Sequence, residues 1–142
     1  MYIFDGAMGT MLQAAGLEEG YCPELFNVEK PEVVKNIHAQ YLQHGSDVIT
    51  TNTFGACGLK LEDYDLQDRV REINIAAVKV AKDAIAEFKP SARVAGSMGP
   101  TGRFLQPLGN MSFDSIYDTY REQAEALIEG GVDFIIIETI ID

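Results

Sequence analysis

The sequence is poor in basic residues, has two cysteines and has no tryptophan. Lys and Arg together number 11 against 22 Asp and Glu, which gives a formal net charge of −11 over 142 residues. Binding to nucleic-acid phosphates or to an anionic membrane surface needs clustered basic side chains, and the sequence contains no such cluster. The composition therefore argues against a nucleic-acid-binding protein and against membrane-surface binding.

Long hydrophobic runs are also missing. The apolar runs, such as Phe134–Ile137, are far short of the ~20 residues that a membrane-spanning helix requires. The first residues, Met1–Asp5, lack the basic start and the apolar stretch of a signal peptide. Cys22 and Cys57 stand alone, in neither a CxxC nor a paired Cys/His spacing. We therefore expect a cytoplasmic protein with reduced thiols, no disulfide and no metal site of its own.

Four short apolar runs are predicted to be strands, and helical patterns separate them. The strands are expected at Tyr2–Phe4, Asp47–Thr51, Arg93–Ala95 and Asp133–Ile137. Helices are expected from Pro31 up to Gly45, over Val70–Phe88, and from Ser112 to Gly130. Short strands that are apolar on both faces are typical of a buried parallel sheet, so the pattern indicates consecutive βα units.

Two α/β architectures fit this order of elements. An open doubly wound sheet would be complete at about this length. A (β/α)₈ barrel needs ~250 residues, so the chain would then hold three units and a fourth strand. Periodicity does not choose between them. The sequence stops just past the fourth predicted strand, with no closing helix, which slightly favours an incomplete barrel.

Polar residues follow each predicted strand. They are Asp5, the pair Asn52 and Thr53, Ser97, and Glu138. In both architectures the carboxyl ends of the strands form the working face, although turn formation explains the first three positions equally well. Glu138 lies between apolar residues on both sides, and a buried carboxylate requires a cationic partner. That partner is either a ligand ammonium or a loop guanidinium such as that of Arg103.

Two glycine-containing loops could hold an anion on their backbone N–H groups, namely Asp5–Thr10 and Gly96–Gly102. Neither has the Lys of a P-loop or the spacing of a dinucleotide fingerprint. An anion cradle beside Glu138 and Asp5 suits a zwitterion, so the residues predict an amino-acid site. No nucleophile is paired with a base. His38 and His44 fall on different faces of the first predicted helix, so we expect no metal site shared by them.

At these same residues the chain resembles the homocysteine S-methyltransferase family. The motifs that carry the resemblance occur in order at Asp5–Thr10, Pro31–Val34, Gly45–Ala56, Gly99–Gly102 and Gly131–Thr139. Within the family, the run Thr-Asn-Thr-Phe-Gly-Ala is most similar to the N-terminal module of the cobalamin-dependent methionine synthases. The resemblance covers essentially the whole chain.

The resemblance implies a (β/α)₈ barrel of the TIM type, with residues 1–142 forming its N-terminal half, cut after the fourth strand. It implies that the loop of Asp5, Gly6 and Ala7, together with Glu138, holds the amino and carboxylate groups of L-homocysteine. Asn52, Thr53 and Ser97 would line the same mouth. The family transfers a methyl group to the zinc-activated thiol of homocysteine to give methionine. In the cobalamin-dependent enzymes the donor is methylcobalamin, recharged from methyltetrahydrofolate.

The zinc ligands of the family are three cysteines on later strands, and neither Cys22 nor Cys57 lies in such a motif. We therefore expect no metal ligand and no catalytic residue here, and an N-terminal piece that is inactive alone. Its partners would be the remaining half of the barrel and the folate and cobalamin modules. Open sheet edges predict self-association. Two alternatives remain: a complete small α/β amino-acid-binding domain without catalysis, and a betaine- or S-methylmethionine-dependent homocysteine methyltransferase.

Overall fold

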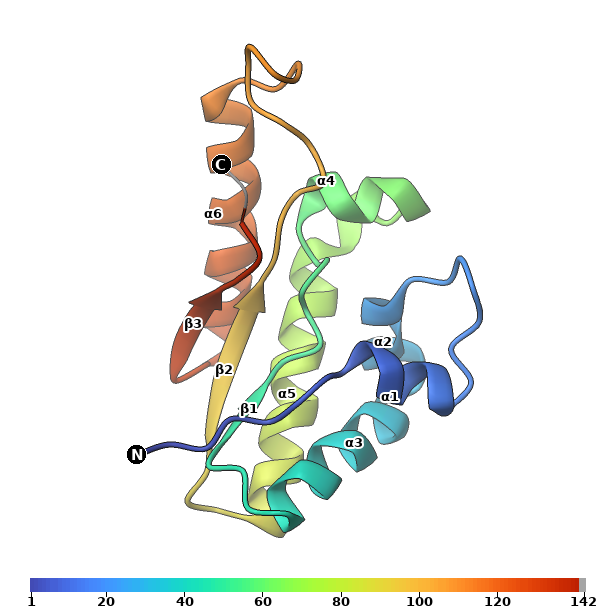
Figure 1. Ribbon diagram of the computed structural model, residues 1–142, viewed down its shortest axis with the longest axis vertical. Coiled ribbons are helices and arrows are strands. Elements are labelled where there is room, and N and C mark those ends of the chain that lie inside the picture. The colour runs from blue at the N-terminus through green and yellow to red at the C-terminus, as the bar shows by residue number, and fades with distance from the viewer. Residues whose placement is uncertain (141–142) are drawn as a thin grey trace.

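A parallel three-stranded sheet forms the centre of the structure, a computed structural model that describes residues 1–140. Its strands are β1 (Val48–Thr50), β2 (Arg93–Met98) and β3 (Phe134–Ile137). They lie in this order, and each pairs in parallel with the next. The connections between them contain helices, as expected for βα units (Figure 1).

Three long helices pack against one face of this sheet, and all three agree with the predictions from the sequence. They are α3 (Pro31–Gln43), α5 (Val70–Phe88) and α6 (Phe113–Gly130). Ser112 begins α6, because its Oγ accepts a 3.2 Å hydrogen bond from the N–H of Ser115. Gly131 ends the same helix in a left-handed conformation with φ 87°.

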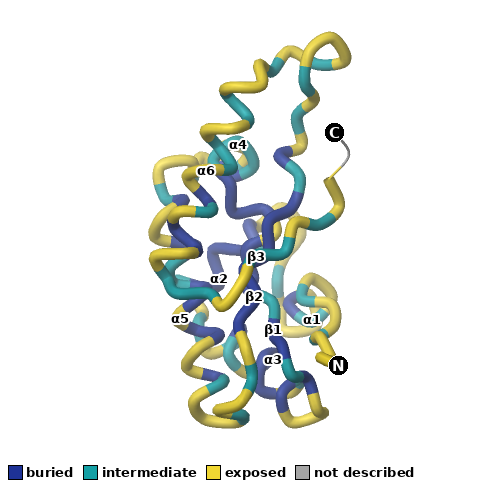
Figure 2. The backbone as a smooth tube through the Cα atoms, turned by 90° about the vertical axis from the view of Figure 1, so that its left-hand side faces the viewer, coloured by how far each residue is buried: buried dark blue, intermediate teal, exposed yellow. Residues whose placement is uncertain are grey.

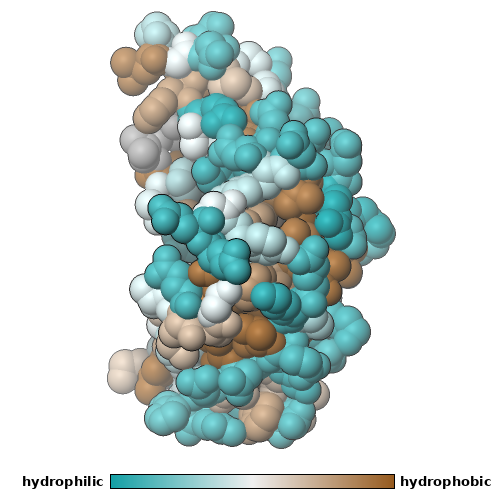
Figure 3. Space-filling model, turned by 90° about the vertical axis from the view of Figure 1, so that its right-hand side faces the viewer, coloured by the Kyte–Doolittle hydropathy of each residue, from teal (hydrophilic) through white to brown (hydrophobic). Residues whose placement is uncertain are grey.

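Short helical turns fill the loops, and the sequence did not predict them. They are α1 (Gly9–Ala14), η1 (Pro23–Leu25), α2 (Phe26–Glu29), α4 (Gly58–Leu61), η2 (Glu62–Tyr64) and η3 (Gln67–Arg69). Segments of three to six residues are too short to display a helical period. Figure 3 views the face that carries α1, α2 and α3, where mostly hydrophilic side chains surround smaller apolar areas.

The predicted first strand, Tyr2–Phe4, is only partly correct. This segment runs beside β1, but only Phe4 forms a bridge, with Val48. The carbonyl of Ile3 accepts hydrogen bonds from the N–H groups of both Asp47 (2.7 Å) and Val48 (3.1 Å). Because one carbonyl takes both bonds, the ladder does not advance regularly, and the segment stays an irregular edge of the sheet.

Strand β2 is longer than predicted, which corrects the interpretation of Gly96–Gly102 as an anion-binding loop. Gly96, Ser97 and Met98 continue the strand in register with β3. A Cβ on Gly96 would lie 3.0 Å from Leu127 Cδ1, so this glycine permits the close approach of α6. The N–H of Ser97 donates to Thr51 Oγ1. Backbone groups that are already paired are not available to a ligand.

The core lies between the sheet and the three long helices, as the buried positions in Figure 2 illustrate. It joins Leu42 of α3, Val78 of α5 and Leu127 of α6 to the strand residues Ile49 and Val94. Gly96 and Leu127 belong to this side, so the alternate strand residues point to the opposite face.

The sheet curls toward that opposite face. Phe4 lies beside β1 and Phe134 begins β3, so a flat sheet would separate them by about 14 Å, three strand spacings. Their ring centroids are nevertheless 6.2 Å apart, in an edge-to-face arrangement. The architecture is therefore a curved parallel α/β sheet with its long helices outside, consistent with half of a (β/α)₈ barrel.

Within residues 1–140, no helix combines the length and the apolar character needed to cross a membrane. Cys22 and Cys57 are both free, as predicted, and the structure shows in addition that both are buried.

His38 provides a test of the packing of α3. Its side chain is fully buried, and neither ring nitrogen has a hydrogen-bond partner among the residues described. Burial lowers the pKa of His38 from 6.5 to about 4.

Between these two pKa values the unfolded chain binds more protons than the native one, so the stability of the native state falls as the pH decreases. From pH 7 to pH 4 the wild-type chain should lose roughly 3 kcal/mol more than His38→Leu.

Urea unfolding at several pH values measures this difference. Asn36, which is exposed on α3 and does not titrate, is the matched control, and Asn36→Leu should keep the wild-type pH dependence. Parallel curves for wild type and His38→Leu would show that His38 is not desolvated as described.

Candidate functional site

A cavity of about 490 Å³ lies on the curled face of the sheet, at the carboxyl ends of the strands. It brings together six of the seven predicted site residues, namely Asp5, Gly6, Ala7, Asn52, Ser97 and Glu138. Thr53 is the exception, because it is fully buried and does not line the cavity. Segments far apart in the sequence therefore meet at one site, as parallel strands require.

Asp5 is held against the end of β1 by two hydrogen bonds from one residue. The N–H of Thr50 donates to Asp5 Oδ2 at 2.7 Å, and Thr50 Oγ1 donates to Asp5 Oδ1 at 2.8 Å. Burial raises the pKa of Asp5 above its usual value, and the charge of Glu138 adds to this, while the bonds from Thr50 oppose it. A cation in the cavity would stabilise the charged carboxylate.

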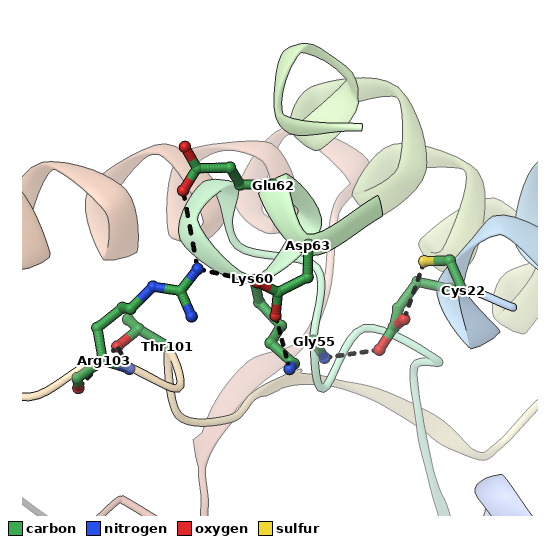
Figure 4. Close-up of polar contacts among 8 residues, drawn as sticks. Cys22, Gly55, Lys60, Glu62, Asp63, Thr101 and Arg103 are labelled. Carbon is green, nitrogen blue, oxygen red and sulfur yellow. Dashed lines mark hydrogen bonds and ion pairs between the residues drawn. The ribbon is translucent and has the colours of Figure 1, made fainter. Parts of the chain in front are cut away.

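Glu138 is fixed from the neighbouring strand. Its Oε1 accepts a 2.5 Å hydrogen bond from Ser97 Oγ. The alternative partner considered from the sequence, Arg103, is engaged elsewhere, with Asp63 at 2.8 Å and Glu62 at 3.8 Å (Figure 4). Within the described part of the chain, no basic side chain pairs with Glu138.

The loop of Gly6 and Ala7 forms one wall of the cavity. Tyr41 of α3 secures it, because its Oη donates a 2.7 Å hydrogen bond to the carbonyl of Ala7. A Cβ at Gly6 would lie 3.0 Å from Tyr41 Oη, so a glycine is needed for this approach. Across residues 1–140, the N–H groups of Gly6 and Ala7 meet no hydrogen-bond acceptor. They are therefore available to a carboxylate ligand.

Asn52 lines the cavity while its amide holds the loop in place. Its Nδ2 donates to the carbonyl of Pro23 at 2.8 Å, and its own carbonyl accepts a 2.7 Å hydrogen bond from Asn27 Nδ2. The amide nitrogen is thus turned toward η1, and Asn52 joins the wall of the cavity to η1 and α2.

Glu24 is a residue of the site's surroundings that sequence reasoning did not identify. This carboxylate is only 6% exposed. Its Oε1 accepts a 2.7 Å hydrogen bond from the N–H of Gly55, and Cys22 Sγ lies 3.3 Å from its Oε2 (Figure 4). A Cβ at Gly55 would lie 2.8 Å from Glu24 Oε1. Glu24 therefore fixes the loop that follows β1, at a position that accepts only glycine without rearrangement.

Several lining residues were also absent from the prediction. They are Phe4, Met8, Gly9, Thr50, Thr51, Phe54 and Ile136. Strand alternation could have identified Ile136, which lies two residues before Glu138 and faces the same side. The loop residues carry no comparable signal.

Residues 1–140 hold no zinc site of the kind that the family resemblance implies for later strands. Within residues 1–140, no group of three or more His, Cys, Asp or Glu side chains is placed to hold a metal ion. Zinc binds cysteine as the thiolate. Burial raises the pKa of Cys22 to about 12, and it raises that of Cys57 as well. Among residues 1–140, neither thiol belongs to a cluster of ligands that could hold zinc.

Comparison with known proteins identifies the family. Residues 2–142 match the sequence profile described as homocysteine S-methyltransferase. The chain belongs to this family. The recognition made from the five ordered motifs is therefore confirmed, and with it the assignment to an enzyme family.

Two methionine synthases are among the relatives of this chain. The one from Mycobacterium tuberculosis is 41% identical over 95% of this chain and 12% of its own length, and the one from Mycobacterium leprae is 37% identical with the same coverage. The metallated form of the homocysteine methyltransferase MmuM from Escherichia coli is a structural neighbour. It has a TM-score of 0.81 and 26% identity over 98% of this chain and 54% of its own. The chain thus spans about half of that structure and a small part of the methionine synthases.

The raised pKa of Asp5 predicts the effect of Asp5→Asn on stability. A carboxyl group with a raised native pKa binds more protons in the native state than in the unfolded state, so its contribution to stability falls as the pH rises through that range. Asparagine can accept the bond from the N–H of Thr50 on its oxygen and donate from its amide nitrogen to Thr50 Oγ1, so both contacts can remain. The stability of Asp5→Asn relative to wild type should therefore increase as the pH rises from 3 to 7.

Asp47→Asn is the control, and its stability relative to wild type should change in the opposite direction. Lys89 lowers the pKa of Asp47, so Asp47→Asn should lose stability relative to wild type over the same range. Urea unfolding across this range measures both differences. A constant difference between Asp5→Asn and wild type would contradict the desolvation of Asp5.

Proposed function

We propose that this chain is the amino-acid-binding half of a homocysteine S-methyltransferase barrel, of the kind found in methionine synthases. The observation that carries the proposal is that the carboxylate residues Asp5 and Glu138 line one cavity together with Gly6 and Ala7. Two carboxylates with no basic side chain beside them favour an ammonium group. Two unpaired N–H groups favour a carboxylate.

L-Homocysteine carries both groups on its α-carbon. Its carboxylate would lie on the N–H groups of Gly6 and Ala7, and its ammonium between Asp5 and Glu138. The apolar side chains of Phe4 and Ile136 line the same cavity and would contact the methylene groups of the ligand. This arrangement orients the thiol without supplying a group that activates it.

Activation of the thiol would come from outside residues 1–142. We propose that zinc-binding cysteines lie in the remaining half of the barrel, because Cys22 and Cys57 do not fit the role. The metallated MmuM, of which this chain matches 54%, supports a metal in the complete barrel. Methylcobalamin as donor, and folate and cobalamin modules as partners, stay proposals that rest on the similarity to methionine synthases. The expected cytoplasmic location likewise stays a prediction.

Calorimetric titration with L-homocysteine tests the binding. The chain should bind it, and Glu138→Gln should weaken binding about tenfold or more, since a charge-assisted hydrogen bond contributes about 1.5–3 kcal/mol. Glu125→Gln, on the exposed face of α6, is the matched control and should bind as wild type does. Equal affinity of wild type and Glu138→Gln would refute the ammonium site.

The open edges of the sheet support the further proposal that the isolated chain self-associates. Ile137 on the outer strand is 71% exposed, and Tyr2 and Phe4 at the other edge are 61% and 45% exposed. Size-exclusion chromatography with light scattering should show a dimer or larger species. Ile137→Lys should shift it toward the monomer, whereas Ile128→Lys, at an exposed position of α6, should not. A monodisperse wild-type monomer would contradict this proposal.

A further inference from the structure

Ser97 lies where one neighbouring strand ends and the other continues. The register pairs β1 with β2 only as far as Thr50 and Ala95, while Ser97 still pairs with Ile136 of β3. The backbone N–H and C=O of Ser97 that face the β1 side therefore have no strand beside them. Buried backbone groups of this kind need other partners.

Two threonine hydroxyls take the place of the missing strand. The N–H of Ser97 donates to Thr51 Oγ1 at 3.1 Å, and Thr53 Oγ1 donates to the carbonyl of Ser97 at 2.7 Å. The two hydroxyl oxygens are 2.6 Å apart. All three residues are at most 3% exposed, so water does not compete for these bonds.

The number of hydroxyl hydrogens determines which group donates and which accepts in the bonds among Ser97, Thr51 and Thr53. A threonine hydroxyl has one hydrogen to donate. The hydrogen of Thr53 goes to the carbonyl of Ser97, so the hydrogen of Thr51 must lie between the two threonine oxygens. The result is a closed ring in which the N–H of Ser97, the hydroxyl of Thr51 and the hydroxyl of Thr53 each donate once. Bonds in such a chain strengthen one another.

The ring fixes the backbone of the residue that contacts Glu138. Ser97 Oγ donates to Glu138 Oε1 at 2.5 Å, and the direction of that side chain follows from its backbone. Gln123 of α6 supports the ring from the other side, because its Nε2 donates to the carbonyl of Thr53 at 2.8 Å. Thr53 itself does not reach the cavity.

We propose that Thr53 is a positioning residue that acts through Ser97 to hold the Glu138 carboxylate at the place where the ligand ammonium binds. The role of the ammonium rests on the proposed function. Loss of the Thr53 hydroxyl leaves the carbonyl of Ser97 with only the 3.5 Å contact from Gln123. The strand can then shift, and the Glu138 carboxylate shifts with Ser97.

The preference of the chain for a ligand that carries an amino group tests the proposal. The dissociation constants of L-homocysteine and of 4-mercaptobutanoate, which lacks the amino group, are compared by calorimetry. The preference of the wild-type chain for homocysteine should fall about tenfold in Thr53→Val, the loss of roughly one well-placed charged contact. Thr53→Ser keeps the hydroxyl and should keep the preference. Thr119→Val, on α6, is the matched control and should also keep it.

A ligand-free measurement makes the test independent of binding. The ¹³C resonance of the Glu138 carboxyl carbon should shift in Thr53→Val in the same direction as in Ser97→Ala, and should stay at its wild-type position in Thr53→Ser and Thr119→Val. An unmoved resonance in Thr53→Val would overturn the positioning role, and so would an equal weakening of both ligands. If the wild-type chain does not prefer homocysteine, the proposed function fails, and the resonance alone decides the role of Thr53.

Discussion

Side-chain amides that donate to backbone carbonyls hold the loop after β1, and the site depends on them. Asn27 of α2 donates to the carbonyl of Asn52, Gln123 of α6 to that of Thr53, and Asn74 of α5 to that of Ala56. Asn27, Asn74 and Gln123 are at most 2% exposed. A loop that leaves a sheet in the protein interior has backbone groups that neither a strand nor water satisfies, and each unpaired group would cost about 1–3 kcal/mol. Hydrogen bonds from three helices that are far apart in the sequence therefore stabilise the same conformation of this loop.

This arrangement links packing to the shape of the cavity. The helices bury their apolar faces against the sheet, and the same helices carry the amides that orient the loop. The amide nitrogens of Asn27, Asn74 and Gln123 all have partners, although the side-chain oxygens of Asn27 and Gln123 meet none among the described residues. The loop contributes Asn52 and Phe54 to the cavity wall. A shift of α6 would thus alter the cavity even though α6 does not line it.

The sequence predicted the parts of the structure that repeat or that stand at special positions. Helical spacing located α5 at its observed bounds, and Pro31 and Ser112 marked helix starts. The position of Glu138 after an apolar strand indicated a carboxylate with an unusual partner, and its flanking residues located the strand. The family resemblance then supplied the barrel, which periodicity alone did not distinguish from an open sheet.

What escaped prediction depends on contacts between distant segments. Nothing local in Glu24 or Gln123 shows that each will meet the loop after β1. The extent of β2 depends on its pairing with β3 rather than on its own glycine-rich sequence, so the prediction ended the strand at Ala95. The role of Thr53 is a further case, because its neighbour in space, Ser97, lies 44 residues away.

The carboxylate of Asp5 opposes the folding of the chain that carries it. Burial and the charge of Glu138 both raise the pKa of Asp5, so the charged form is held at a cost in stability. The overall charge of −11 does not relieve it. A protein keeps such groups where function needs them, since sites built for a ligand are rarely optimal for stability without it. Under the proposed function, the ligand ammonium lies beside Asp5 and offsets this cost, so the site favours a zwitterion over a neutral or anionic molecule of similar shape.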